Sequence, residues 1–376
     1  MRRIRGCGRS CIRKGATLAS PLPVNPHGAL RIVAIGGGTG LSALLRGLKE
    51  YVSHPGPGSS DAPPARLPHI EITAVVTVTD DGGSSGRLRR ELDVLPPGDI
   101  RTCMVALSED EALLSKLFQY RFPSGRGLKD HSFGNLFLTA LSHLTGDFAK
   151  AVAISTDILA SRGRIYPSTA ANVTLEAQLE DDSVIAGETK ISRSKSRIHR
   201  IRLNPRRCRP LAETLAAIEH ADLICLGPGS LYTSVIPNLL VEGIPEAIRR
   251  SPARKAYFVN LMWQPGETMD YRSSDHVKAI FDHSFDGIID TLVLNTRPIT
   301  GARRRRYAAQ RVYPVQNDYP RLGELGLRVV GRNLLARGDK IRHLPQAIAS
   351  VAVELAQESR ASRMTGRASL LAMGGY

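Results

Sequence analysis

Three glycine-rich turns, each directly after an apolar segment, constrain the fold of this chain more than any other feature of its sequence. The segments cover residues 31–35, 70–78 and 223–226, and the turns read GGGTG, DDGGSSG and GPGS. Helical patterns follow at 41–51, where leucines recur at helical spacing, and at 231–240. Repeated strand–turn–helix units predict a mostly parallel sheet that is covered by helices on both faces.

The middle of the chain departs from this alternation. Residues 171–179 alternate between apolar and polar side chains, an acidic turn follows, and residues 184–191 return, which predicts an added β-hairpin. Residues 198–203 can add a third strand. Strand–helix alternation then resumes, with further strands expected at 256–259, 287–294, 311–315 and 327–330. The predicted fold class is α/β, a Rossmann-like three-layer α/β/α sandwich with a mostly parallel sheet and an added β-hairpin.

A single α/β domain is expected over residues 29–358, and three segments fall outside its pattern. Residues 1–28 contain six Arg and Lys, no acid and no apolar core of a secretory signal, which predicts a basic disordered tail or a start codon placed too far upstream. Residues 53–69 are rich in Pro, Gly and Ser and are predicted to form an inserted surface loop. Residues 359–376 are expected to form a frayed C-terminal tail.

The net charge of +16 suggests a nucleic-acid partner at first. The positions of the charged residues along the chain do not support it. Nineteen of the 51 Lys and Arg lie in three acid-free runs, at 1–28, 190–209 and 303–306, the last of which is expected on a loop. The other charges nearly balance, so a surface that binds nucleic acid is not predicted. The five cysteines are odd in number and scattered, which favours a cytoplasmic location. No apolar run approaches the ~20 residues of a membrane helix.

Two adjacent carboxylates, Asp80 and Asp81, follow Thr79 at the end of the second apolar segment. In an open α/β sheet this position lies at the carboxyl end of a strand, where ligands bind. The carboxylates can hold sugar hydroxyls, bind Mg²⁺, or supply a general base. One of them can instead cap its own turn through an Asx hydrogen bond. We predict that Asp80 contacts the ligand and that Asp81 shapes the turn.

The glycine turns suit phosphate binding, because the absence of side chains lets backbone N–H groups approach an anion at the start of a helix. The first turn is not the GxGxxG of dinucleotide-binding proteins, and no lysine follows it as in a P-loop. Close packing of a helix on a strand explains such glycines equally well. In the third turn, Ser230 can cap the next helix or bond a phosphate.

The segment HSFGNLFLTAL carries a further polar group. His131 and Asn135 are four residues apart, which predicts that they share one helix face, and Ser132 is a candidate N-cap. His131 is either a satisfied structural residue or a ligand contact. Neither a Ser-His-Asp set nor a zinc-binding set can be assembled from the sequence, so the catalytic residues are unknown and no metal ligand is assigned.

Seven segments occur in order between roughly residues 30 and 355: GGGTGLSALLRGLK, ITAVVTVTDDGGSSGRLR, PPGDIRTCMVAL, HSFGNLFLTAL, GETKI, LGPGSLYTSVIPNLL and NLMWQPGETMDYRSSDHVKAI. Together they resemble the gluconeogenesis factor family (YvcK-like), which is related to the 2-phospho-L-lactate transferases (CofD-like). The resemblance implies a Rossmann-like fold and a cytoplasmic bacterial protein that binds a UDP-sugar, typically UDP-N-acetylglucosamine. It implies a regulator of carbon-source-dependent cell-wall synthesis and cell shape. Cell-wall regulatory proteins are then candidate partners, and the question whether the protein forms a homodimer is left open.

Carried over position by position, the resemblance implies three groups of ligand contacts. The nucleotide would be lined by Gly37, Gly38, Thr39 and Gly40, and the sugar or acceptor would lie beside Thr79, Asp80 and Asp81. The pocket would be closed by Asn135, Gly227, Gly229, Ser230 and Tyr232, while Arg342 in DKIRHLP would bind a phosphate. Two positions depart from the family pattern. Asp130 stands where a Gly commonly precedes His131, and Trp263 stands where a small polar residue is usual.

Two functions follow as alternatives. In the first, which we favour, the protein is a UDP-sugar-binding regulator without established catalysis and without a certain cofactor. In the second, it is a CofD-like phosphotransferase that uses a guanosine-diphosphate donor, with Asp80 holding Mg²⁺ and positioning the acceptor hydroxyl. An NAD-dependent dehydrogenase is disfavoured by the broken GxGxxG pattern.

Overall fold

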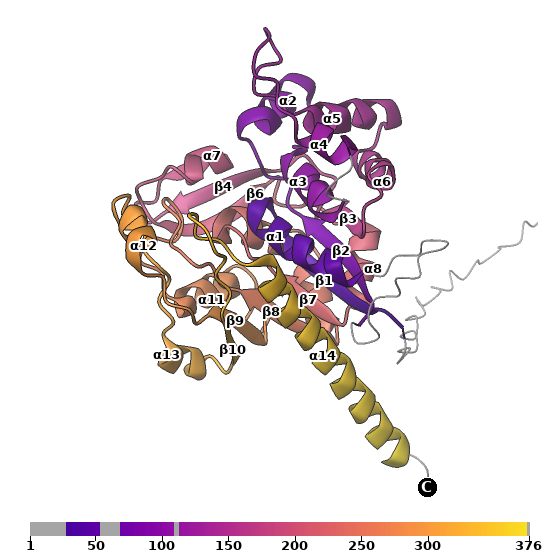
Figure 1. The fold of residues 1–376 in the computed structure, drawn as a ribbon, viewed down its shortest axis with the longest axis vertical. Coiled ribbons are helices and arrows are strands. Elements are labelled where there is room, and N and C mark those ends of the chain that lie inside the picture. The colour runs from indigo at the N-terminus through magenta and orange to yellow at the C-terminus, as the bar shows by residue number, and fades with distance from the viewer. Residues whose placement is uncertain (1–27, 53–67, 109–112, 374–376) are drawn as a thin grey trace, which may run out of the picture.

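A parallel seven-stranded sheet runs through the centre of the protein (Figure 1). The computed structural model describes residues 28–52, 68–108 and 113–373, and within 366–373 only the course of the helix. The strand order is β10-β9-β8-β7-β1-β2-β3, and every neighbouring pair is parallel. The strands are β1 (Leu30–Gly36), β2 (Ile70–Val76), β3 (Arg164–Pro167), β7 (Leu223–Leu226), β8 (Arg254–Phe258), β9 (Thr291–Asn295) and β10 (Arg328–Arg332).

Helices cover both faces of this sheet. One layer consists of α1 (Gly38–Leu48), α3 (Gly98–Leu107) and α14 (Pro345–Met373), which pack against one another or against β1, β2 and β7. Because crossovers between parallel strands are right-handed, the helices that connect β7 to β10 lie on the opposite face. That layer consists of α10 (Ile244–Arg250), α11 (Ser273–Asp282) and α13 (Tyr319–Glu324), with α8 (Ala212–Glu219) packed on α10. The predicted three-layer Rossmann-like α/β fold is confirmed.

The strand sequences reflect this double cover. Apart from the exposed Arg31, every residue of β1 is buried, and β7 is buried throughout. A strand that packs helices on both faces reads as a continuous apolar run, which is why the sequence pattern located both strands.

The predicted β-hairpin is present as part of a second, antiparallel sheet with the order β5-β4-β6. Its strands are β4 (Thr174–Leu179), β5 (Val184–Ala186) and β6 (Ile198–Asn204). The return strand is shorter than the predicted 184–191. Gly187 adopts a φ of 98°, which ends the strand and starts the short helix α7 (Glu188–Ile191).

The remaining helices lie between successive strands of the seven-stranded sheet. Four of them gather at one end of the molecule (Figure 1): α2 (Gly83–Leu92), α4 (Leu113–Gln119), α5 (Phe133–Thr145) and α6 (Phe148–Ile158). Shorter pieces are η1 (Lys49–Tyr51), the π-helical turn η2 (Leu231–Val235), α9 (Ile236–Leu239) and α12 (Gly301–Ala308). Within the described ranges, no helix is both long and apolar enough to cross a bilayer.

Several segment predictions were wrong. Residues 303–306 lie in α12, where arginine's good helix propensity and largely exposed positions suit a surface helix. Residues 311–315 form only an isolated bridge at Pro314, because proline cannot donate to a ladder. The four-residue strand β3 was missed because it is too short to show alternation. The predictions for 1–28 and 53–69 concern residues that lie almost wholly outside the described ranges.

The predicted tail from residue 359 is instead a continuation of α14, which runs to Met373. Its outer part is held by a buried ion cluster at the amino end of β7. Arg360 and Arg363 both pair with the carboxylate of Asp222, whose side chain is 5% exposed. Asp222 also accepts a hydrogen bond of 2.8 Å from the backbone N–H of Arg31 in β1. This Asp222 cluster therefore joins α14 to the amino ends of two central strands.

Candidate functional site

The direction of strand succession reverses between β1 and β7. β2 and β3 follow β1 on one side, and β8, β9 and β10 follow β7 on the other. In open α/β sheets the crevice outside the carboxyl ends of the strands at such a reversal is the usual ligand site. The first and third glycine turns follow these two strands.

These two turns are in direct contact. A Cβ on Gly40 would lie 2.7 Å from the carbonyl carbon of Pro228 and 2.8 Å from the Cα of Gly229. Gly36 likewise faces the backbone of Gly227. The glycines therefore allow the two turns to pack closely against each other, whereas the alternative stated from the sequence was packing of a helix on a strand.

The second turn lies beside the first. The backbone N–H of Thr77 donates to Gly36 at 2.9 Å, which continues the β1–β2 ladder beyond the strand ends. The Thr79 hydroxyl is buried, 3.1 Å from that of Thr77 and 3.4 Å from the carbonyl of Thr233 in η2. All three turns thus meet at one edge of the sheet.

Carboxylates of the chain itself occupy the start of the helices that follow the first and third turns. Asp99 accepts a hydrogen bond from the backbone of Gly38 at the first turn of α1. Glu267 accepts one from the backbone N–H of Tyr232 at 3.1 Å and one from the Thr233 hydroxyl at 3.2 Å. Negative side chains stabilise helix amino ends, so a phosphate at either place would meet an anion already there.

Burial raises the pKa of both carboxyls. The pKa of Asp99 rises to about 7, with the nearby Asp80 carboxylate as the second cause. The pKa of Glu267 also rises to about 7, although the hydrogen bonds from Tyr232 and Thr233 oppose the shift. Both groups therefore exchange protons near neutral pH.

The second turn is shaped by Asp80 and not, as predicted, by Asp81, while the ligand contact of Asp80 stays a prediction. Asp80 accepts a 2.9 Å hydrogen bond from the backbone N–H of Gly82, which is the Asx-type turn expected of Asp81. Asp81 instead accepts from both the backbone N–H and the hydroxyl of Thr189 in α7, at 2.8 and 2.6 Å. The sequence could not show this, because α7 reaches Asp81 from more than 100 residues away.

Glu188 completes the acidic surroundings. Its Oε2 is buried and has no hydrogen-bond partner within the described residues. Burial, and then the nearby Asp99 and Asp80, raise its pKa well above the usual value. We call the group Asp80, Asp81, Asp99, Glu188 and Glu267 the acidic crevice. The last three were missed in the sequence, although each lies in a short segment with glycine or proline nearby.

His131 and Asn135 belong to a hydrogen-bond network that joins three helices. Ser132 caps α5 as predicted, so His131 precedes the helix and does not share its face. His131 Nδ1 lies 2.9 Å from the Ser84 hydroxyl, and Asn135 bonds Ser84 at 3.1 Å and Arg101 at 2.9 Å. Burial lowers the pKa of His131. These contacts give both side chains structural partners in α2 and α3.

The other predicted contacts are spread along the same edge. Ser230 accepts a 2.6 Å hydrogen bond from Gln264 and does not cap η2. The Tyr232 hydroxyl is 2.7 Å from that of Tyr271, so its ring lies in the core and away from the turns. Arg342 is exposed, and in the described part of the chain its guanidinium forms no hydrogen bond or ion pair. The neighbouring His343 bonds the backbone of Val259 at the end of β8.

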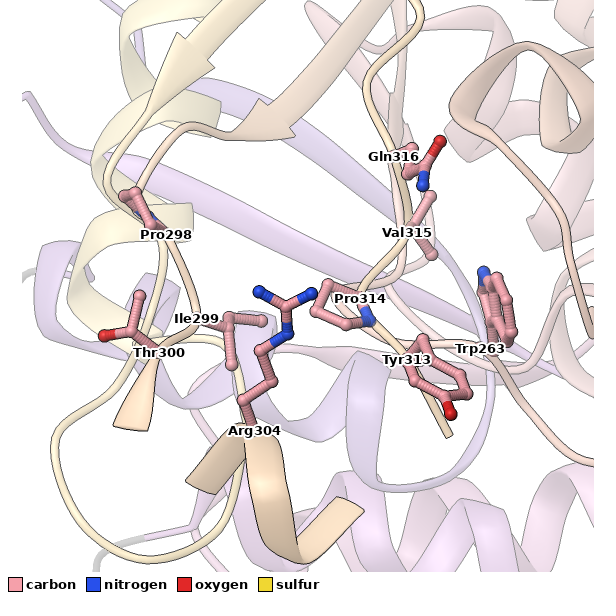
Figure 2. A pocket seen from close by; sticks show the side chains of 9 residues that line it. All are labelled: Trp263, Pro298, Ile299, Thr300, Arg304, Tyr313, Pro314, Val315 and Gln316. Carbon is pink, nitrogen blue, oxygen red and sulfur yellow. The ribbon is translucent and has the colours of Figure 1, made fainter. Parts of the chain in front are cut away.

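Two adjoining cavities open at the carboxyl ends of β8 and β9. The smaller, of about 180 Å³, is lined by the ends of these strands, including Asn260 and Asn295. The larger, of about 380 Å³, contains Trp263 and Tyr313 (Figure 2). Both continue the edge on which the acidic crevice lies.

The family of the chain follows from comparison with known proteins. Residues 32–335 match the family described as 2-phospho-L-lactate transferase CofD. This chain belongs to the CofD family. The matched range of the CofD family includes every member of the acidic crevice, whereas Arg342 lies beyond it.

Several CofD-family relatives carry the name gluconeogenesis factor. The chain is 45% identical over 329 residues to the protein of that name from Bacillus subtilis, covering 87% of this chain and 98% of the relative. Identity to the Halalkalibacterium halodurans protein is 44% over 324 residues, 86% of this chain and 95% of that one. A crystal structure of a Bacillus halodurans protein of the UPF0052 family has a TM-score of 0.79 at 44% identity and covers 86% of this chain and 99% of that chain. The resemblance to the gluconeogenesis factor family is confirmed.

The raised pKa values of Asp99 and Glu267 predict how the stability of this CofD-family protein changes with pH. A carboxyl whose folded-state pKa exceeds its unfolded value stabilises the fold fully below the unfolded pKa and loses that contribution as the pH rises through the folded value. The melting temperature should therefore fall between pH of about 4, the usual carboxyl pKa, and about 7. In Asp99→Asn the amide still accepts from Gly38, and the fall should be shallower. The exposed Asp157→Asn should leave the change of melting temperature with pH as it is in wild type. If Asp99→Asn also changes with pH as wild type does, the raised pKa of Asp99 is contradicted.

Proposed function

We propose that this CofD-family protein is a cytoplasmic nucleotide-sugar-binding regulator, with UDP-N-acetylglucosamine as its ligand and with carbon-source-dependent cell-wall synthesis and cell shape as the processes it controls. The observation that carries the proposal is the acidic crevice at the reversal between β1 and β7. Carboxylates accept hydrogen bonds from hydroxyl groups, of which a nucleotide sugar has several on its sugar and ribose. The name gluconeogenesis factor, carried by relatives at 44–45% identity, supports a role tied to the carbon source.

The phosphates of such a ligand need cations at the rim of the crevice. Arg101 lies near Asp80 and Asp99, and its described hydrogen bonds use only Nε and one Nη, towards Asn135 and Thr102. Arg342 is exposed at the same edge of the sheet and is the second candidate. Because the helices after the first and third turns already hold carboxylates, these arginines are better placed than the glycine turns to balance the diphosphate.

Calorimetric titration with UDP-N-acetylglucosamine tests the proposal. Wild-type protein should bind, and Asp80→Asn should bind about tenfold or more weakly, since a hydrogen bond to a charged group contributes about 1.5–3 kcal/mol. The asparagine keeps the bond to Gly82 and so preserves the turn. Asp157→Asn on the exposed face of α6 is the matched control and should bind as wild type does. Absence of heat with every UDP-sugar would refute nucleotide-sugar binding.

A transferase of the CofD type is the second candidate, and one observation favours it. Glu188 places an unpartnered, buried carboxylate oxygen near Asp80, Asp81 and Asp99. Mg²⁺ is usually held by one or two carboxylates together with substrate phosphates. Among the described residues, no group of three or more His, Cys, Asp or Glu is arranged to hold a metal ion, so these carboxylates would need the ligand's phosphates to complete the site. When bound, the ion would offset the negative charge of the acidic crevice, which otherwise repels a diphosphate. Binding of GDP that requires Mg²⁺ and is lost in Glu188→Gln would support the transferase, whereas metal-independent binding of a UDP-sugar would support the regulator.

A further inference from the structure

The larger cavity beyond β8 and β9 has a composition that the acidic crevice lacks. Its walls are the rings of Trp263, Tyr313, Pro298 and Pro314 and the side chain of Ile299, and Arg304 reaches over it (Figure 2). We call it the aromatic pocket. Its volume of about 380 Å³ has room for a nucleobase and part of a ribose. We propose that the aromatic pocket binds the base of the nucleotide ligand, an inference that rests on the proposed function and places one part of the ligand.

The two aromatic rings are held in a fixed arrangement. Their centroids are 5.1 Å apart with an interplanar angle of 63°, an edge-to-face pair. The indole N–H of Trp263 donates to the carbonyl of Tyr271 at 3.1 Å, and its backbone N–H donates to the carbonyl of Tyr313 at 2.9 Å. These bonds fix the indole and its backbone before any ligand binds. Stacking a flat ring on the pair therefore loses little conformational entropy.

The aromatic pocket is continuous with the rest of the site. It shares Pro298, Ile299, Pro314 and Val315 with the smaller cavity at the ends of β8 and β9. Asn260 in that cavity donates to Gln264 at 3.0 Å, and Gln264 donates to Ser230 of the third turn at 2.6 Å. These neutral polar groups connect the third turn, at the edge where the acidic crevice lies, with the smaller cavity that adjoins the aromatic pocket. A ligand with hydroxyls at one end and an aromatic ring at the other fits this course.

The charge of the pocket agrees with a nucleotide. Among the described residues that line it, Arg304 alone carries a charge, and it projects from α12 with no described ion pair. Figure 2 shows its guanidinium pointing towards Pro314, across the opening. A guanidinium attracts both an aromatic face and a phosphate oxygen. The Gln316 amide supplies one donor group and one acceptor, which match the edge of a base.

Fluorescence can test the proposal directly, because Trp263 is the single tryptophan of the chain. Titration of wild-type protein with UMP, UDP or UDP-N-acetylglucosamine should change its emission and saturate at the concentrations found by calorimetry. N-acetylglucosamine 1-phosphate, which has a sugar and a phosphate but no base, should leave the emission unchanged. GMP and AMP run in parallel show which base the pocket prefers.

Substitutions complete the test. Tyr313 is 39% exposed, so Tyr313→Ala should fold normally and bind UDP-N-acetylglucosamine about tenfold or more weakly, the loss that removal of a base–aromatic stack causes. Tyr319→Ala, at a tyrosine that is 50% exposed on α13, is the matched control and should bind as wild type does. Calorimetric binding with unchanged emission and unchanged affinity of Tyr313→Ala would overturn the aromatic pocket and leave the proposed function standing. If no nucleotide produces either heat or a change in emission, both are overturned.

Discussion

Replacing Gly40 with alanine is expected to remove nucleotide binding and to lower the melting temperature. The new Cβ would stand 2.7 Å from the carbonyl carbon of Pro228 and 2.8 Å from the Cα of Gly229, closer than carbon atoms approach one another. Both neighbours are backbone atoms, so no side chain can turn aside, and the first and third turns must separate. Overpacking of this kind costs about 1–3 kcal/mol, and the displaced turns would also misplace the carboxylates of the acidic crevice.

Thermal unfolding and titration with UDP-N-acetylglucosamine measure the two effects of Gly40→Ala. Gly323→Ala is the control, because a Cβ at this position in α13 has no neighbour within 4 Å and its φ is not positive. Alanine exceeds glycine in helix propensity, so this control should be neutral or slightly stabilising. A Gly40→Ala protein that melts and binds as wild type does would mean that the two turns are not packed as described.

Replacing Asp222 with alanine should be the most destabilising single change away from the ligand site. Arg360 and Arg363 are 11% and 18% exposed, and without Asp222 they would leave two buried positive charges unpaired. Breaking a buried ion pair by removing one partner costs about 3–5 kcal/mol. The free energy of unfolding, measured with urea, should fall by that amount, while nucleotide affinity of the folded protein should not change.

A matched control for Asp222→Ala is Glu219→Ala, three residues earlier in the chain. Glu219 pairs with Arg250 at 3.7 Å, but both side chains are about half exposed. Exposed pairs contribute about 0–1 kcal/mol, so this variant should be nearly as stable as wild type. Equal losses in the two variants would show that burial is not what gives the Asp222 cluster its strength.

The sequence predicted β1, β2 and β7 of the central sheet because these strands are apolar runs that lead into glycine turns. The turns that follow them meet because the carboxyl ends of parallel strands share one edge. The sequence did not predict Asp99, Glu188 and Glu267 as site residues, and the reason is physical. Each comes from a different part of the chain. Only the fold brings Asp99 to the first turn, Glu267 to the third turn and Glu188 near the carboxylates of the second turn. An acid like Asp99 in the first turn of a helix looks in sequence like any other helix-stabilising residue.

That Asp80 and not Asp81 makes the turn bond has a similar cause. From the sequence, the aspartate next to the glycines is the better candidate for a local turn. In the structure, Thr189 offers Asp81 two donors at 2.8 and 2.6 Å, and the turn bond falls to Asp80. A long-range contact has displaced a local one, which no reading of neighbouring residues can foresee.

The Asp222 cluster divides the molecule between two tasks. It joins β1, β7 and α14 at the amino ends of the strands, whereas the acidic crevice and the aromatic pocket lie beyond their carboxyl ends. Substitutions that tune ligand preference at one edge therefore leave the anchor at the other edge untouched. Such a separation lets recognition diverge among descendants while the scaffold persists. It also means that a version of this chain shortened before Arg360 would lose its anchor and keep every residue of the acidic crevice and the aromatic pocket.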